Sequence, residues 1–220
     1  MVTALKFAVE PPPRSTYRHG DLRRALIDAG IALASDGGPD AVVLREATRR
    51  AGVVPNAAYR HFANRQALFE AVRAAALAAL AVAMEAELAA AAAQVDGNDP
   101  VAKARANLRA IGAGYLKFAQ TQTGLFRTAF ATPTMVEDDR DPAKAGPSGL
   151  NPFQLLGAAL DALVATGVLP AERRPGAEYL AWSAVHGLAL LIIDGPLRHA
   201  DEAQRIALGE RVLAMVEKGL

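Results

Sequence analysis

Hydrophobic residues recur at helical spacing along most of this 220-residue chain. In the first such stretch, apolar side chains fall at positions 22, 25, 26, 29 and 33, which is the spacing of one buried helix face. Asp21 is a suitable N-cap for this helix, and Gly37 with Gly38 ends it. No stretch shows the strict alternation of a half-buried strand, so the pattern predicts an all-α fold.

The longest predicted helix follows Asn64, a suitable N-cap, and runs from Arg65 to about Ala93. Its alanine-rich second half has low complexity, but apolar residues at positions 77, 80, 84 and 88 keep a helical period through it. We therefore predict a long connecting helix. Five further helical segments are expected: Val101 to Gln120, Leu125 to Ala131, Pro152 to Thr166, Pro175 to Ile193 and Asp201 to Lys218. With two short helices between the first helix and the long one, the expected total is about nine.

Residues 44–62, LREATRRAGVVPNAAYRHF, contain two short helical stretches that meet at Gly52. Glycine suits the left-handed backbone of a tight turn, and Pro55 suits the first turn of a second helix, expected from Pro55 to His61. Ala58 and Phe62 face inward there, which leaves the opposite side to an outside partner. This is how a recognition helix enters a DNA major groove. An ordinary amphipathic hairpin has the same spacing.

The same region resembles the DNA-binding domain of the TetR family of bacterial transcriptional regulators. Upstream, YRHGDLRRALIDAGIALASDGGPDA is similar to the first helix of that family, and RHGDLRRAL is typical of its branch with a C-terminal WHG domain. Trp182, His186 and Gly187 in WSAVHG match the motif that names this domain. Val43 and Val54 depart from the pattern, because a Ser or Thr often caps the helix at each position. A lost cap costs roughly 1 kcal/mol. The two valines also leave open whether this protein makes the two phosphate contacts expected at these positions.

The resemblance implies a three-helix, helix-turn-helix domain followed by a helical domain that binds an effector and dimerises. We expect a disordered lead at residues 1–13, where three prolines are consecutive. The helix-turn-helix domain is expected at residues 14–64 and the effector-binding and dimerisation domain at residues 65–220.

Contacts with DNA are also implied by the resemblance. Tyr59 and His61 match positions that touch phosphates, whereas Asn56 and Arg60 are the most informative for base readout, because Asn pairs with adenine and Arg with guanine. Arg65 is expected where the N-terminus of the long helix faces phosphate. The basic arm before the first helix either reaches a minor groove or is solvated. The expected DNA-binding residues are Arg14, Arg18, Arg45, Asn56, Ala57, Tyr59, Arg60, His61 and Arg65.

Most of the aromatic residues lie in the middle of the second domain, where the resembling family encloses an effector pocket. A single aromatic residue at helical spacing is more often core than pocket wall, but an apolar cavity with few polar anchors is the usual form of a small-molecule site. Tyr115, Gln122, Arg127 and His186 are the candidate anchors. Whether Trp182 and His186 line the pocket or only pack stays open. The expected effector-binding residues are Tyr115, Phe118, Phe126, Phe130, Phe153, Leu156, Leu160, Trp182 and His186.

One helix-turn-helix offers little contact, so a homodimer is expected, with recognition helices about 34–36 Å apart on a pseudo-palindromic operator. The resemblance places the dimer interface on the last two helices. Gly187 either lets backbones approach closely in this contact or eases local packing. These helices carry more apolar residues than one buried face requires: Leu180, Val185, Leu188, Leu191, Ile192, Ile206, Val212, Leu213 and Val216.

Charge is unevenly distributed along the chain. Residues 14–73 hold ten arginines and six acidic residues, whereas residues 74–220 hold thirteen basic and sixteen acidic residues. A basic N-terminal part is the footprint expected of phosphate binding. The chain has no cysteine, no signal pattern, and no apolar run that reaches the ~18 residues of a membrane span. We therefore expect a cytoplasmic protein.

Neither a metal site nor a cofactor is expected. The acidic residues at 137–141 lack the alternating spacing and bracing glycine of a calcium loop, and residues 132–149 are expected to form a mobile surface loop. No nucleophile–base pair or phosphate loop is visible. The leading hypothesis is a ligand-responsive transcriptional repressor that binds double-stranded DNA as a homodimer and is released by a small-molecule effector. An effector-independent DNA-binding protein and an α-helical enzyme are the alternatives, and an activator would share the same sequence.

Overall fold

The computed structural model describes residues 22–95, 98–132, 136 and 139–220. The predicted capping by Asp21 and the predicted lead at residues 1–13 lie outside these residues. Within them the protein is all-α, as predicted, and no strand occurs. The α-helices are α1 (Leu22–Gly37), α2 (Leu44–Arg50), α3 (Pro55–Ala58), α4 (Arg65–Ala92), α5 (Pro100–Thr121), α6 (Thr123–Ala129), α7 (Pro152–Ala165), α8 (Ala177–Ile193) and α9 (Glu202–Gly219). Short 3₁₀ helices are η1 (Pro39–Ala41), η2 (Pro142–Lys144), η3 (Ala171–Arg173) and η4 (Pro196–His199).

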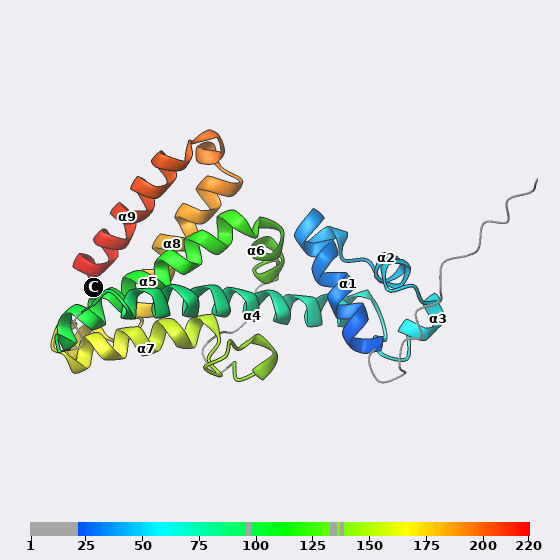
Figure 1. Cartoon of the computed structure of the whole chain (residues 1–220), viewed down its shortest axis with the longest axis horizontal. Coiled ribbons are helices and arrows are strands. Elements are labelled where there is room, and N and C mark those ends of the chain that lie inside the picture. The colour runs from blue at the N-terminus through cyan, green and yellow to red at the C-terminus, as the bar shows by residue number, and fades with distance from the viewer. Residues whose placement is uncertain (1–21, 96–97, 133–135, 137–138) are drawn as a thin grey trace, which may run out of the picture.

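The molecule is elongated, and α4 runs through most of its length (Figure 1). Helices α1, α2 and α3 gather at one end, where α1 packs against the start of α4. Helices α5 and α7 lie along α4 in the body, and α8 and α9 pack on the other side of α5. One continuous apolar core extends from α1 to α8. Helix α4 therefore joins the group of α1, α2 and α3 to the body formed by α5, α7, α8 and α9.

Local signals set the start of α4, and small residues set how closely it packs. The Asn64 side chain accepts a hydrogen bond from the backbone N–H of Ala67 at 2.9 Å, as the predicted N-cap should. Alanine-rich turns then let α5 approach α4 closely. At Gly114 of α5, a Cβ would lie 2.7 Å from Met84 Cα, so no side chain fits between the two backbones there. The alanine background is thus a packing surface.

Helix α4 is also long and apolar enough, by length and composition alone, to cross a membrane. No uninterrupted apolar run of the sequence reaches this length, and the apolar window of α4 does so only by including charged residues. Half of this window is buried inside the protein. The helix packs against α1, α5, α6 and α7, which is the environment of a core helix.

Residues 139–149 are folded onto α4, in contrast to the expected mobile loop. Lys144 forms an ion pair with Asp139 at 2.5 Å. The Glu85 carboxylate of α4 accepts hydrogen bonds from the backbone N–H of Ser148 at 3.1 Å and from its hydroxyl at 2.5 Å. The side-chain amide of Asn151 donates to the carbonyl of Asp139 at 2.8 Å. This segment, residues 139–151, is called the strap below. No cluster of three potential metal ligands occurs among the described residues.

Candidate functional site

Helices α2 and α3 form the predicted pair around Gly52, whose φ of +67° is the left-handed conformation that the turn requires. Helix α3 is shorter than predicted, because it ends at Ala58 instead of His61. The chain continues in a tight turn, in which the N–H groups of His61 and Phe62 both bond to the carbonyl of Ala58 at 2.9 Å. Phe62 is 3% exposed, and its burial pulls the chain inward at this point.

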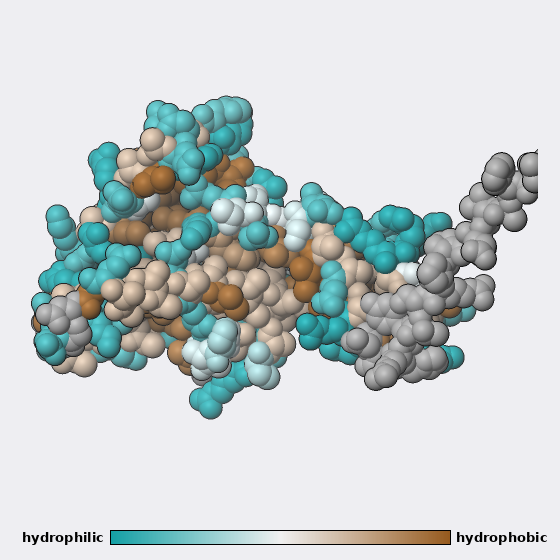
Figure 2. All heavy atoms as spheres, in the orientation of Figure 1, coloured by the Kyte–Doolittle hydropathy of each residue, from teal (hydrophilic) through white to brown (hydrophobic). Residues whose placement is uncertain are grey.

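The outward side of α3 and its turn is exposed. Asn56, Tyr59, Arg60 and His61 are all solvent-exposed, and Ala57 is half-buried. Ala58 and Phe62 are buried as predicted, and Arg23 of α1 stacks over the Phe62 ring at 5.4 Å. The structure thus brings five predicted DNA-binding residues together on one surface. The reading head is defined here as α1, α2 and α3, and Figure 2 shows a strongly hydrophilic surface around α2.

The arginines of α2 differ in their surroundings. Arg49 pairs with Glu46 at 2.5 Å, and this bond lowers the pKa of the Glu46 carboxyl. Arg50 pairs with Asp36 of α1 at 2.7 Å. Arg45 is exposed and forms no ion pair within the described part of the chain, as is also true of Arg60. Arg45 and Arg60 therefore present their charges to solvent.

Arg65 is exposed, but its guanidinium is hydrogen-bonded to the backbone of the same chain. Its guanidinium donates to the carbonyl of Val42 at 2.8 Å and to the carbonyl of Pro39 at 3.2 Å. These bonds tie the N-terminus of α4 to the segment that leads into α2, so Arg65 holds the reading head on α4. Arg14 and Arg18 lie outside the described residues. Val43 and Val54 stand at the N-caps of α2 and α3 without a side-chain cap, as predicted, and Val54 is 69% exposed.

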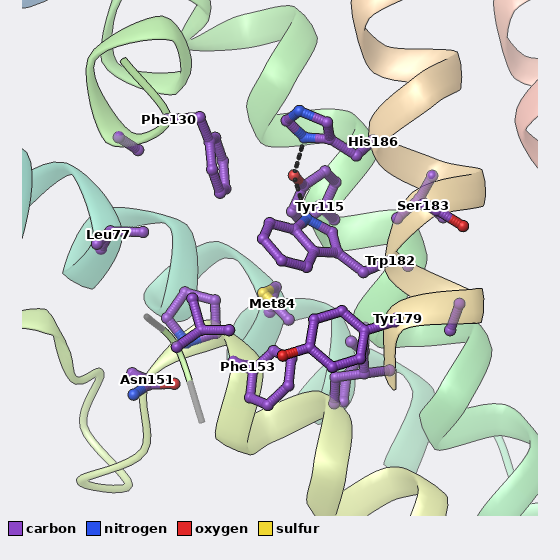
Figure 3. A pocket seen from close by; sticks show the side chains of 18 of the residues that line it. Leu77, Met84, Tyr115, Phe130, Asn151, Phe153, Tyr179, Trp182, Ser183 and His186 are labelled. Carbon is purple, nitrogen blue, oxygen red and sulfur yellow. Dashed lines mark hydrogen bonds between the residues drawn. The ribbon is translucent and has the colours of Figure 1, made fainter. Parts of the chain in front are cut away.

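A cavity of about 540 Å³ lies in the body between α4, α5, α7 and α8. Aromatic side chains from three helices and from the end of α6 surround it (Figure 3). Tyr115, Phe130, Phe153, Leu156, Trp182 and His186 line it, as predicted. The volume falls within the usual range for small-molecule sites, which is about 300–1,000 Å³.

Three of the cavity side chains form a hydrogen-bonded chain, drawn in Figure 3. The indole N–H of Trp182 donates to the hydroxyl oxygen of Tyr115 at 3.0 Å, and that hydroxyl lies 2.6 Å from Nδ1 of His186. The Tyr115 oxygen accepts from Trp182, and the direction of its bond with Nδ1 is set by which ring nitrogen of the neutral imidazole carries the proton. Burial raises the pKa of Tyr115 far above its ordinary value and lowers the pKa of His186. Trp182 and His186 therefore line the cavity and also bond within the protein.

Other predicted pocket residues lie off the cavity wall. Phe118, Phe126 and Leu160 are buried in the core. Phe126 packs edge-on behind Tyr115, with ring centroids 5.4 Å apart. Of the candidate anchors, Gln122 caps α5 and Arg127 pairs with Asp194, so neither reaches the cavity.

Several residues that line the cavity were not predicted from the sequence. Tyr179 is one, although residues 179, 182 and 186 share the i, i+3, i+7 spacing of one helix face, and this signal was available. Asp139, Lys144 and Asn151 line the cavity from the strap, and nothing in the sequence indicated that the strap folds back. Other missed wall residues are Leu77, Met84, Leu108, Arg109, Leu213 and Val216.

The outer faces of α8 and α9 carry exposed apolar residues. Leu180, Leu191 and Ile206 are exposed by 63%, 45% and 56%, whereas Val185, Leu188 and Ile192 of the predicted interface are buried within the chain. Val212, Leu213 and Val216 are half-buried. Met215 and Leu190 are further exposed apolar residues on these helices, at 59% and 42%.

Comparisons with known proteins agree with this architecture. Residues 26–72 match the family model described as bacterial regulatory proteins of the tetR family, and residues 108–216 match a tetracyclin repressor-like C-terminal domain. No match was found among curated proteins. A protein of unknown function from Rhodococcus sp. RHA1 has a similar structure, with a TM-score of 0.69 and 23% identity, over 94% of this chain and 99% of that one. A TetR-family transcriptional regulator from Pectobacterium atrosepticum gives a TM-score of 0.58 and 18% identity, over 94% and 96% of the two chains.

The helix-turn-helix at one end and the helical body at the other define a DNA-binding transcription regulator. The two family models cover both parts. The chain belongs to the TetR family, and its C-terminal domain is of the WHG type that Trp182, His186 and Gly187 indicate.

Proposed function

We propose that the protein is a cytoplasmic, homodimeric repressor that leaves its operator when a small molecule enters the cavity. The observation that carries the proposal is the physical connection between the exposed surface of the reading head and the cavity lined by aromatic side chains. Leu77 and Met84 of α4 line the cavity, and the N-terminus of the same helix holds the reading head through Arg65. An effector can shift the protein between two states only through a difference in its affinity for them.

Helix α6 supplies a second connection. Ala129 and Phe130, at its C-terminal end, line the cavity. At its N-terminal end, Gly124 lies directly against the backbone of Ala34 and Ser35 in α1. A ligand that displaces the Phe130 ring therefore pushes on a short helix that touches the reading head. Movement of α4 and α6 together would change the separation of the two heads in a dimer.

In this proposal, phosphate contacts position the head, and a few base contacts specify the sequence. Tyr59, His61 and Arg45 are assigned to phosphates, and Asn56, Ala57 and Arg60 to base edges. Arg65 is reassigned to positioning the head, because its guanidinium already bonds to two backbone carbonyls.

Arg60→Ala is expected to weaken binding to the specific operator by about 1–3 kcal/mol and to relax one operator position. Tyr59→Phe is the matched control, because the loss of one phosphate contact weakens binding to all sequences more evenly. The operator is first selected from random double-stranded DNA with the wild-type protein, and dissociation constants are then measured on this operator and on random DNA. If Arg60→Ala weakened binding to the operator and to random DNA equally, Arg60 would not contribute to base readout. Failure of the wild type to enrich any sequence would contradict the function itself.

Charged substitutions on the outer faces of α8 and α9 are expected to separate the dimer without unfolding the chain. Leu180 and Ile206 are more than half exposed within one chain, so a glutamate there costs little in the monomer and much in an apolar interface. We expect Leu180→Glu with Ile206→Glu to give a folded monomer by analytical ultracentrifugation, with unchanged circular dichroism. Val82→Glu is the control, because Val82 is 48% exposed on α4, away from these faces. A double variant that stays dimeric would place the interface elsewhere.

A further inference from the structure

The cavity wall is dominated by rings. Tyr115, Phe130, Phe153, Tyr179, Trp182 and His186 surround the space, and successive ring centroids lie 5.0–6.5 Å apart. Most of these neighbours meet edge-on or tilted. Flat faces and edges of this kind favour a rigid aromatic guest over a flexible chain, because ring–ring contacts add to the burial of apolar area.

The polar groups of Tyr115, Trp182 and His186 are neutral and bonded to one another. Trp182 donates to the Tyr115 hydroxyl, which shares a second hydrogen bond with Nδ1 of His186. Tyr115 keeps its proton and His186 stays uncharged, because burial raises the pKa of the one and lowers the pKa of the other. The rings therefore offer dipoles, and no formal charge, to a bound molecule.

Each charged side chain on the wall already has a partner of opposite sign. Lys144 pairs with Asp139 at 2.5 Å, within the strap. Arg109 pairs with Glu217 of α9 at 2.5 Å. A charged ligand would lose its hydration without gaining an unpaired counter-charge in the described part of the wall, and such desolvation is costly.

We propose that the cavity binds an uncharged aromatic molecule and discriminates against both anions and cations of the same shape. This inference deepens the proposed function and rests on it, since it names the chemical class of the effector. The aromatic rings favour a planar ligand. The charged wall residues are already paired within the protein, so they offer no counter-charge to an ionic ligand.

Three probes of one shape and different charge test the proposal: biphenyl-4-methanol, biphenyl-4-carboxylate and biphenyl-4-methylammonium. Isothermal titration calorimetry at pH 7.4, with the full-length protein and no DNA, is expected to give a dissociation constant at least tenfold lower for the alcohol than for either ion. Phe153→Ala is expected to weaken binding of the alcohol at least fivefold, because it removes one wall ring. Val101→Ala, at an exposed residue of α5 off the cavity wall, is expected to leave binding of the alcohol unchanged.

Tighter binding of the carboxylate, lost in Lys144→Met, would overturn the proposal in favour of an anion site at the strap. Tighter binding of the ammonium would overturn it in favour of a cation held by the rings. Equal binding of all three probes, or binding of none, would also contradict it. DNA binding is measured separately on the same samples, so a protein that holds its operator and fails these titrations refutes the ligand class alone.

Discussion

Phe126→Ala is expected to lower the free energy of unfolding by about 3–5 kcal/mol, which is the usual cost of removing a fully buried phenylalanine ring. Phe126 is 1% exposed and packs against Tyr115, Phe130 and His186, with ring centroids 5.0–5.6 Å apart. Its loss leaves a void directly behind the cavity wall. Chemical denaturation monitored by circular dichroism measures the effect.

Phe153→Ala is the matched control for this substitution. Phe153 is half-buried on the wall itself, where space is already present, so its removal is expected to cost less stability and more ligand affinity. The two variants make the same chemical change, so they compare the loss of a ring in the core with the loss of a ring on the cavity wall. A smaller loss of stability for Phe126→Ala than for Phe153→Ala would contradict the close packing of the Phe126 ring against its neighbours.

Gly124→Ala is expected to lower the free energy of unfolding by about 1–3 kcal/mol and to weaken operator binding. A Cβ on this residue would overlap the carbonyl oxygens of Ala34 and Ser35 and would lie 2.9 Å from the Ser35 carbonyl carbon. These are backbone atoms, so α6 and α1 must separate to admit a methyl group. A shifted reading head should raise the operator dissociation constant by about tenfold, equivalent to 1.4 kcal/mol.

Gly219→Ala serves as the control, because no heavy atom of the described residues lies within 4 Å of a Cβ placed there. Alanine also has the higher helix propensity, so this variant is expected to match or slightly exceed the wild type in stability. Stability is measured by denaturation, and operator affinity by fluorescence anisotropy. Wild-type operator affinity in Gly124→Ala would show that α6 does not transmit movement to α1.

The positions of the helices were predictable because their signals are local. Apolar spacing and the caps at Asn64 and Gly52 place the boundaries within a few residues. Helix α3 was predicted too long, because the turn after Ala58 depends on the burial of Phe62 against α1, which is a tertiary contact. The hydrogen bond from the Arg65 guanidinium to the carbonyl of Val42, which lies 23 residues earlier, was not predictable, because it too is a tertiary contact.

The cavity was predictable as a region but not residue by residue. Phe118 and Phe126 have the same side chain as Phe130 and Phe153, and all four lie on or at the end of helices. Which ring faces the cavity depends on how far each helix is rotated against its neighbours, and composition does not encode this rotation. The strap was missed for a related reason, since Glu85 and Ser148 meet across 63 residues.

Helix α4 has a consequence for how the protein unfolds. Its 28 residues contain neither glycine nor proline, and it contributes to the apolar core at both ends of the molecule. At about 1.5 Å per residue it spans roughly 42 Å as one uninterrupted hydrogen-bonded rod. Because helix formation is cooperative, loss of its first turns exposes the base of the reading head and propagates toward the body. The two domains therefore share one folding unit, and calorimetry should show a single melting transition rather than two.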